Sequence, residues 1–130
     1  MTYELLIEKR KIIVSALIKG INDTRDFKFI LDTGATKTII NEHVAIRLGF
    51  DLNSLQKGDR LMTAGGGIHS KVMKIPKFSL FGKDFINIEA SVIKFPPQIA
   101  LLADGLIGMD FLLQFKQITF DFDKNVISLQ

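Results

Sequence analysis

Residues 29–35 are Phe-Ile-Leu-Asp-Thr-Gly-Ala, an apolar run that ends at a carboxylate and is followed by small residues. The apolar run predicts the end of a buried strand, where an unpaired charge is costly. Asp32 must therefore be hydrogen-bonded, paired or functional. Thr33, Gly34 and Ala35 are small enough to let backbone or a ligand approach closely. Taken alone, the tripeptide Asp-Thr-Gly is explained more simply as a strand that turns a corner.

Strand signals dominate the rest of the chain. β-Branched and aromatic residues, among them 11 Phe, favour strands, so the pattern predicts an all-β fold. A short helix is expected from Glu42 to about Leu48, after Asn41 as the N-cap residue. Gly49 follows it where a C′ glycine belongs, and a second helix is expected over 110–115. The predicted strands are 12–18, 26–31, 59–64, 70–80, 84–94, 117–123 and 125–130, the last two forming a hairpin.

Length and composition exclude several classes of protein. The chain has 130 residues, 47% of them hydrophobic and 24% charged, which is typical of one soluble globular domain, here 1–130. No apolar run approaches the ~18 residues that a membrane-spanning helix needs. The start of the sequence has no basic segment followed by a long apolar one, so no signal peptide is visible. We therefore expect a cytoplasmic protein with no membrane segment in this chain.

The residue types present exclude further kinds of chemistry. Because the sequence has no cysteine, disulfides, thiolate nucleophiles and cysteine-ligated metals are excluded. The two histidines, His43 and His69, stand at no recognisable metal-ligand spacing and are interpreted as surface or turn residues. No metal and no cofactor are therefore expected. The net charge of +3 is mild and lacks the dense basic stripe of a nucleic-acid-binding protein, so no nucleic-acid partner is expected.

Two glycine-containing segments follow Asp32 in the chain. Residues 65–67 are three glycines inside the strand-like stretch 61–72, which predicts a hairpin. They match neither a P-loop nor a dinucleotide-binding fingerprint. Gly108 lies in 105–112, where two apolar residues and a glycine precede a short helix. That order indicates close packing of the backbone.

In this order, the three segments resemble the retropepsin-like aspartic proteases. Members of that family have an apolar strand ending in Asp-Thr-Gly-Ala, then a glycine-rich flap, then an apolar-apolar-glycine segment before a short helix. The resemblance covers roughly 27–122, most of the chain. The sequences at 32–36, 108–112 and 119–123 are closer to the cellular and bacterial-type members than to the viral ones. The resemblance implies a closed or orthogonal β-barrel-like fold with one or two short helices.

Two positions depart from the viral pattern. Viral members commonly have an acid just after Asp-Thr-Gly-Ala and an arginine just after the apolar-apolar-glycine segment, and these two residues pair. This chain has Thr36 and Met109 there, so a virus-like network that stabilises the dimer is not expected. The terminal hairpin also extends beyond a simple C-terminal strand, which predicts a remodelled terminal interface.

The resemblance also implies which residues form the site. Asp32 is the catalytic carboxylate, Thr33 hydrogen-bonds across a two-fold axis, and Gly34 lets the substrate backbone lie close. The resemblance also implies substrate contacts for Ala35, which follows this tripeptide. It implies them for the flap glycines Gly65, Gly66 and Gly67, and for the apolar subsite walls Ile68, Leu106 and Ile107.

A single Asp-Thr-Gly implies that two chains are needed. Catalysis in this family uses water held between two carboxylates, one acting as general base and the other, protonated, donating to the scissile carbonyl. The chain has no internal repeat that could supply a second copy, so the resemblance implies a homodimer with Asp32 beside its own copy. The implied activity is hydrolysis of a peptide or protein substrate by an aspartic endopeptidase.

Two other functions remain open from the sequence. The first is a retropepsin-like dimerisation or peptide-binding module with weak catalysis, although the intact Asp-Thr-Gly argues for activity. The second is a small nucleic-acid-binding β-barrel, suggested by the sequence pI near 9.2. Against it, the lysines are scattered and lack the interleaved aromatic residues on which such proteins stack bases.

Overall fold

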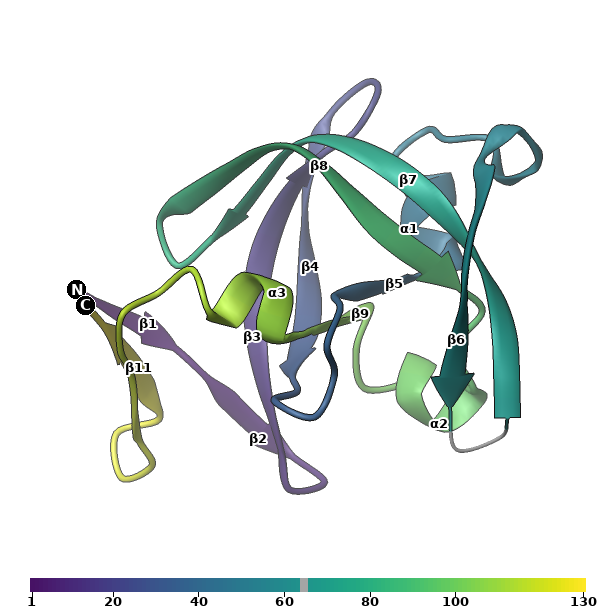
Figure 1. Cartoon of the computed structure of the whole chain (residues 1–130). Helices are drawn as coiled ribbons and strands as arrows, with labels where there is room; N and C mark the ends of the chain where they lie inside the picture. Colours follow the sequence, from purple (N-terminus) through teal and green to yellow (C-terminus); the bar gives the residue numbers. More distant parts are fainter. Residues whose placement is uncertain (64–65) are drawn as a thin grey trace.

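Figure 1 shows a mostly β structure in which one long sheet curls round a core. This computed structural model describes residues 1–63 and 66–130. The long sheet has the spatial order β2 (Leu6–Glu8), β3 (Lys11–Lys19), β4 (Thr24–Leu31), β9 (Gly105–Ile107), β5 (Ile39–Asn41), β8 (Lys83–Ile93), β7 (Gly66–Leu80) and β6 (Gln56–Thr63). Neighbouring strands are antiparallel except for β4–β9 and β5–β8, which are parallel.

An additional pairing closes this sheet into a barrel-like ring. Residues 16–19 of β3 lie antiparallel to residues 77–80 of β7, so β3, β4, β9, β5, β8 and β7 form a closed circuit. The predicted all-β, closed barrel-like fold is therefore confirmed. Closure removes free strand edges from the ring, and β2 and β6 extend beyond it.

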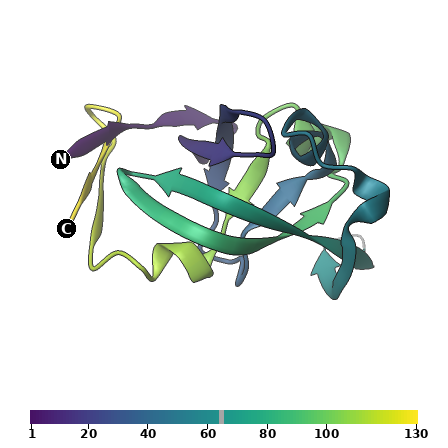
Figure 2. The same ribbon diagram turned by 90° about the horizontal axis from the view of Figure 1, so that it is seen from above.

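A second, smaller sheet joins the two ends of the chain. β1 (Thr2–Glu4) and β10 (Ile118–Asp121) flank β11 (Val126–Leu129), both antiparallel to it. The termini consequently lie together. They are at the end of the molecule opposite the end of β6 (up to Thr63) and the start of β7 (from Gly66), together called the β6–β7 tip here (Figure 1, Figure 2). The sequence predicts the β10–β11 hairpin but not β1 or β2, which are too short to show an alternating pattern.

The first helix lies where the sequence predicts it. α1 (Glu42–Arg47) is followed by Gly49, whose φ of +92° is the left-handed conformation expected of a C′ glycine. Asn41 is the N-cap residue as predicted, although its side chain makes no capping hydrogen bond. Its amide is engaged instead with His43 and Phe95.

The described part of the chain contains three short α-helices, whereas one or two were expected. It also contains a 3₁₀ turn, η1 (Leu52–Ser54). The sequence does not predict α2 (Pro97–Ala100), because consecutive prolines indicate a loop. Pro97 nevertheless fits, since proline is tolerated in the first turn of a helix. α3 (Met109–Leu112) begins one residue before the predicted range and ends earlier than expected.

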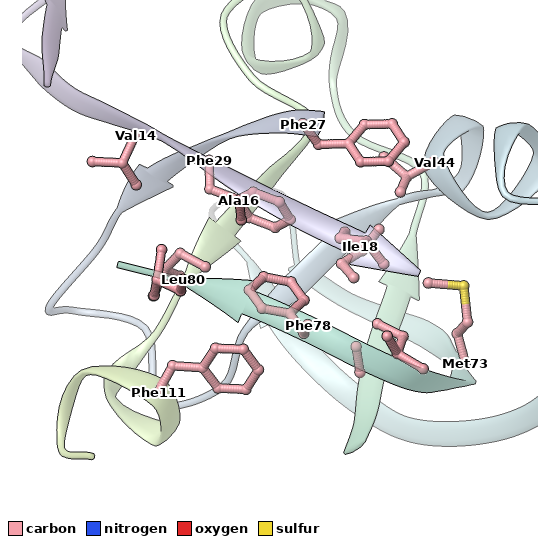
Figure 3. Close-up of a cluster of buried hydrophobic side chains, with 14 of the residues drawn as sticks. Val14, Ala16, Ile18, Phe27, Phe29, Val44, Met73, Phe78, Leu80 and Phe111 are labelled. Carbon is pink, nitrogen blue, oxygen red and sulfur yellow. The ribbon is translucent and has the colours of Figure 1, made fainter. Parts of the chain in front are cut away.

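Phenylalanine rings form the centre of the core (Figure 3). Phe78 packs edge to face against Phe29 of β4 and Phe111 of α3, with ring centroids 5.3 and 4.9 Å away. All three are buried, and burying each such side chain is worth roughly 1.5–3 kcal/mol. Ile30, which points to the other face of β4, is buried in a smaller cluster. Because side chains on both faces of the end of β4 are buried, packing holds the strand in place where the loop with Asp32 begins.

Candidate active site

The loop that follows β4 is held by backbone hydrogen bonds. The Asp32 N–H donates to the Ile107 carbonyl of β9 at 3.0 Å, and the Ala35 N–H donates to the Asp32 carbonyl at 3.1 Å. The Gly34 N–H donates to Asp32 Oδ1 at 2.9 Å. No further hydrogen bond to this carboxylate occurs among the described residues. The half-buried side chain of Asp32 thus has one oxygen fixed in the loop and the other available for chemistry.

The start of α3 packs directly against this loop. The Met109 N–H donates to the Ala35 carbonyl at 2.8 Å. A Cβ built on Gly108 would lie 2.6 Å from the carbonyl of Lys37, so any side chain at this position would displace the loop. The close backbone packing predicted around Gly108 is therefore confirmed.

Thr38 and Asp110 form a clamp between the loop and α3. Thr38 donates to the Asp110 carboxylate through its backbone N–H (3.0 Å) and its hydroxyl (2.8 Å), and the hydroxyl accepts from the Gly108 N–H at 3.0 Å. Thr38 is buried, so its polar groups need these partners. The clamp lies beside Thr36 and Met109, where viral members have their charged pair. The sequence does not predict it, because its two members are far apart in the chain.

A hollow of about 520 Å³, here called the apolar hollow, opens beside Asp32. Most of the predicted site residues line it, namely Asp32, Gly34, Ala35, Gly66, Gly67, Ile68 and Leu106. It is also lined by apolar residues that the sequence does not single out: Ile39, Met62, Ile93, Phe95 and Ile99. These come from elements distant in the chain, so no local pattern links them. The walls suit an apolar side chain of a ligand.

Two of the predicted site residues that the structure describes do not line the apolar hollow. Thr33 is exposed beside it. Ile107 is fully buried in the main core, because successive residues of a strand face opposite sides and Leu106 faces the hollow. The expectation that Ile107 forms a subsite wall is therefore wrong. Gly65 lies outside the described residues.

β6 and the start of β7 bring two glycines to the apolar hollow. In the antiparallel register, Met62 pairs with Gly67 and Thr63 pairs with Gly66. Gly66 has a φ of +110°, which residues with a side chain rarely adopt. A Cβ on Gly67 would collide with the Arg60 guanidinium. The backbone conformation therefore favours glycine at Gly66, whereas at Gly67 the flexible Arg60 side chain could move to make room for a Cβ.

An ion pair connects the loop after Asp32 with β6. Lys37 Nζ lies 2.9 Å from Asp59 Oδ2, and both side chains are at least half exposed. The hydrogen bond from Lys37, and then its charge, lower the pKa of the Asp59 carboxyl, and the same contact raises the pKa of Lys37. Exposure screens such a pair, so it is weak. A further hollow of about 480 Å³ lies beside this pair but does not include Asp32.

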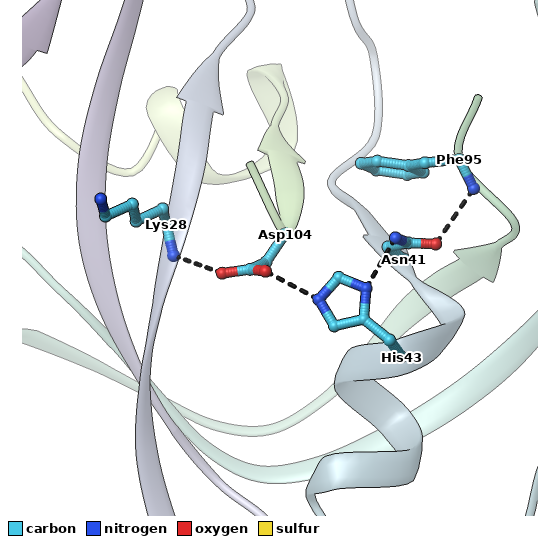
Figure 4. Close-up of polar contacts among 5 residues, drawn as sticks. All are labelled: Lys28, Asn41, His43, Phe95 and Asp104. Atoms are coloured by element: carbon cyan, nitrogen blue, oxygen red, sulfur yellow. Dashed lines mark hydrogen bonds and ion pairs between the residues drawn. The ribbon is translucent and has the colours of Figure 1, made fainter. Parts of the chain in front are cut away.

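A half-buried network supports the wall of the apolar hollow (Figure 4). The Asn41 amide lies 2.7 Å from His43 Nδ1, and Asn41 Oδ1 accepts from the Phe95 N–H at 3.0 Å. His43 Nε2 lies 2.7 Å from Asp104 Oδ1, and Asp104 Oδ2 accepts from the Lys28 N–H at 2.9 Å. The network therefore joins β4, α1 and the segments on either side of α2.

Neutral His43 satisfies every partner in this network. Because Asn41 Oδ1 accepts from Phe95, its amino group donates to His43 Nδ1, and the imidazole Nε2–H donates to Asp104. His43 is thus a structural residue rather than the simple surface or turn residue that the sequence suggests.

The described residues contain neither a candidate metal site nor a membrane-spanning helix. Within 1–63 and 66–130, no group of three or more His, Cys, Asp and Glu side chains is placed to hold a metal ion. Over the same ranges, no helix has the length and apolar character needed to cross a membrane.

Comparison with known proteins connects this geometry to a family. A family model described as Aspartyl protease matches residues 14–111, a range that includes Asp32, the β6–β7 strands and Gly108. The chain belongs to this aspartyl protease family.

Solved structures show that this aspartyl protease family member has a retropepsin-like fold. A retropepsin-like aspartic protease from Rickettsia conorii is 25% identical, with a TM-score of 0.73 over 99% of this chain and 89% of that one. EIAV protease in complex with the inhibitor HBY-793 is 20% identical, with a TM-score of 0.63 over 82% and 88% of the two chains. The retroviral protease-like domain of Ddi1 from Leishmania major is also 20% identical, with a TM-score of 0.57 over 98% and 89%.

A curated relative is considerably longer than this chain. It is an uncharacterised protein of Rickettsia prowazekii, 33% identical over 102 residues. The match covers 78% of this chain but 41% of that protein, so the chain spans about two-fifths of its relative's length.

Proposed function

We propose that the protein is an aspartic endopeptidase that works as a homodimer. The observation behind the proposal is the position of Asp32. Its carboxylate is half-buried, is held through one oxygen by the Gly34 N–H, and borders the apolar hollow. A carboxylate beside a hollow lined by apolar side chains and glycine backbone suits a peptide with an apolar residue next to the scissile bond.

A second carboxylate must come from a second chain. The sequence has a single Asp-Thr-Gly, and Asp is followed directly by Gly only at Asp104. Both oxygens of Asp104 are engaged, by the Lys28 N–H and by His43, so this carboxylate is unsuited to activating water. A two-fold axis beside Asp32 would bring two copies of it together. The exposure of Thr33 in the same loop supports a contact across that axis.

Peptide hydrolysis then needs only these two carboxylates and water. The ionised Asp32 takes a proton from the water molecule while the water oxygen attacks the scissile carbonyl carbon. The protonated Asp32 of the other chain donates its proton to the carbonyl oxygen. As the tetrahedral intermediate collapses and the C–N bond breaks, the Asp32 that took the proton from water gives it to the leaving amine. One hydroxyl of the intermediate returns its proton to the other Asp32, which restores the starting state of the pair. Two carboxylates at such close range cannot both ionise, so they share one proton.

The β6–β7 tip is the proposed flap. Gly66, Gly67 and Ile68 line the same hollow as Asp32, which supports closure of these strands over a bound peptide. Closure would exclude bulk water while leaving room for the nucleophilic water.

Cleavage of a peptide library, followed by mass spectrometry, tests this function. Wild type is expected to cleave beside apolar residues, with a rate that falls at both low and high pH because one carboxylate must be protonated and the other ionised. Asp32→Asn is nearly isosteric and should abolish cleavage without lowering the thermal midpoint. Cleavage retained by a homogeneous Asp32→Asn preparation would refute the assignment. Binding of a pepstatin-type inhibitor without any cleavage by wild type would favour a peptide-binding module instead.

A further inference from the structure

A second hollow adjoins the apolar hollow at Asp32. The second hollow has a volume of about 320 Å³ and is lined by residues 10–12 of the β2–β3 hairpin and by the end of β4. Asp32, Ile99 and Leu106 line both hollows. A peptide that extends past Asp32 from the apolar hollow therefore meets the β2–β3 hairpin.

The surface formed by these two adjoining hollows carries positively charged side chains in both of its parts. Arg10 and Lys11 line the second hollow, and Lys94 lines the apolar hollow. Among the described residues that line either hollow, Asp32 is the only acidic one. The three cations are exposed, and none of them forms an ion pair with any residue in 1–63 or 66–130. A bound ligand can therefore supply the missing negative charge.

The β2–β3 hairpin holds two of these cations in a defined place. Glu8 pairs with Lys11 in the antiparallel register. Lys9 and Arg10 have φ values of 51° and 62°, the left-handed pair of a tight two-residue turn. Glu8 is the acidic residue of the hairpin, and it is exposed and makes no ion pair with Lys11. The backbone at Arg10 and Lys11 is thus fixed by the strands on either side.

We propose that this surface selects peptides with acidic side chains near the apolar residue that enters the apolar hollow. The inference rests on the proposed role of the hollow in binding peptides. A glutamate or aspartate can meet Arg10 or Lys11 in the second hollow, while Lys94 supplies a cation in the other part of the surface. A lysine or arginine in the peptide meets like charges instead, so basic substrates are disfavoured.

Peptide binding to the Asp32→Asn variant of the whole 130-residue chain tests this inference without requiring cleavage. The probes are short fluorescent peptides with a central Leu-Phe pair and with Glu, Gln or Lys at the flanking positions, measured by anisotropy at low salt. Each well-placed Glu should tighten binding about threefold to fivefold relative to Gln, as expected for exposed ion pairs. High salt should reduce the gain.

Charge variants of the hairpin locate the effect. Arg10→Gln and Lys11→Gln should each reduce the preference for Glu over Gln, and Arg10→Glu should shift the preference toward the Lys peptide. Lys19→Gln is the matched control, because Lys19 is exposed and lies at the opposite end of β3 from Lys11. It removes the same charge and should leave the preference unchanged.

Three results would overturn the inference. The first is equal binding of the Glu and Gln peptides. The second is a loss of the preference for Glu over Gln in Lys19→Gln as large as in Arg10→Gln. The third is weaker self-association of Arg10→Gln in sedimentation while its preference for Glu over Gln stays unchanged. The second would indicate net charge alone, and the third would assign Arg10 to a contact between chains. Hydrolysis by wild type is scored separately. Cleavage without an acidic preference refutes only this inference, and an acidic preference without cleavage refutes only the endopeptidase.

Discussion

Gly108 and Gly20 each lack a side chain at a point where two backbone segments touch. A Cβ on Gly108 would lie 2.6 Å from the carbonyl of Lys37, in the loop that begins at Asp32. A Cβ on Gly20 would lie 2.5 Å from the Leu48 carbonyl oxygen. The two clashes are alike in severity, but only the first involves the candidate catalytic loop.

We predict that Gly108→Ala and Gly20→Ala each lower the free energy of unfolding by about 1–3 kcal/mol, as overpacked sites do. Only Gly108→Ala should impair hydrolysis, by about tenfold or more, because a small shift of Asp32 disturbs the reacting geometry. Chemical unfolding and kcat/KM, measured well below the thermal midpoints, check both variants. Equal effects on activity would contradict the role of Gly108 in holding the loop.

Asn41 is the central residue of the network in Figure 4. Asn41→Ala removes the acceptor of the Phe95 N–H and the donor to His43 Nδ1. Leaving buried polar groups unpaired costs about 1–3 kcal/mol, so the free energy of unfolding should fall by that amount in a urea titration. Asn53→Ala, at an exposed position of η1, is the control and should change it by less than about 0.5 kcal/mol. An equally small change at Asn41 would show the network to be dispensable.

Individual site residues differ in how visible they are in the sequence. Asp32 and Gly108 can be found because each lies in a short motif next to an apolar run. Thr38 and Asp110 bind one another across a long separation in the chain, so neither stands in a local pattern. Ile107 is misassigned because a three-residue strand is too short to indicate which of its residues faces the core.

Backbone conformation restricts the sequence at the start of β7. Gly66 has a φ of +110°, and no atom lies within 4 Å of a Cβ built there. A side chain at this position is therefore opposed by the backbone conformation and not by its neighbours. Gly82 provides a comparison, with a φ of +72° in the turn at the other end of β7.

We predict that Gly66→Val lowers kcat/KM by about tenfold, the effect expected of moderate backbone strain, with little change in thermal midpoint. Gly82→Val should lower the thermal midpoint without changing the activity of the folded protein. Steady-state kinetics and thermal unfolding of the two variants separate these effects. Wild-type kinetics for Gly66→Val would show that the tip does not act as a flap.

The Lys37–Asp59 ion pair joins two elements and makes stability depend on pH. The hydrogen bond from Lys37 lowers the pKa of Asp59 below its ordinary value of 3.8. The resulting stabilisation is present above that ordinary value and is lost as the pH falls through the lower pKa of the folded state. The pKa of Lys37 is raised above 10.5, so its contribution is present below 10.5 and is lost as the pH rises through the folded pKa.

We predict that wild type and Asp59→Asn differ in free energy of unfolding at neutral pH and converge in acid. The difference should be small, because both side chains are exposed. In a Lys37→Gln background, Asp59→Asn should have no such effect at any pH. Urea titrations from neutral to acid pH check both comparisons. A difference that persists without Lys37 would mean that the ion pair is not its source.

Long elements are predicted well, whereas several very short ones are missed. The predicted strands 70–80 and 84–94 fall close to β7 (Gly66–Leu80) and β8 (Lys83–Ile93), because their residues alternate over many positions. β1 and β2 have 3 residues each and α2 has 4. Such segments take their structure from partners elsewhere in the fold, so propensity alone does not reveal them.

The arrangement of the whole molecule limits how a second chain can bind at the termini. Within one chain, β11 is already paired on both edges, with β1 and with β10. A sheet shared between two chains could therefore continue only from the outer edges of β1 or β10. The all-β class is readable from composition, whereas the order of strands depends on distant pairings. The remodelling of the terminal interface stays a prediction.

A mixing experiment tests directly whether one active site needs Asp32 from two chains. Wild type and Asp32→Asn are mixed at a fixed total concentration, under conditions in which chains exchange between dimers. Peptide hydrolysis is the readout. If only the wild-type homodimer is active, an equal mixture retains about one quarter of the activity of wild type alone, because random pairing makes one quarter of the dimers wild type. An activity of about one half, in proportion to the wild-type chains present, would show that each chain acts alone and would contradict a shared active site.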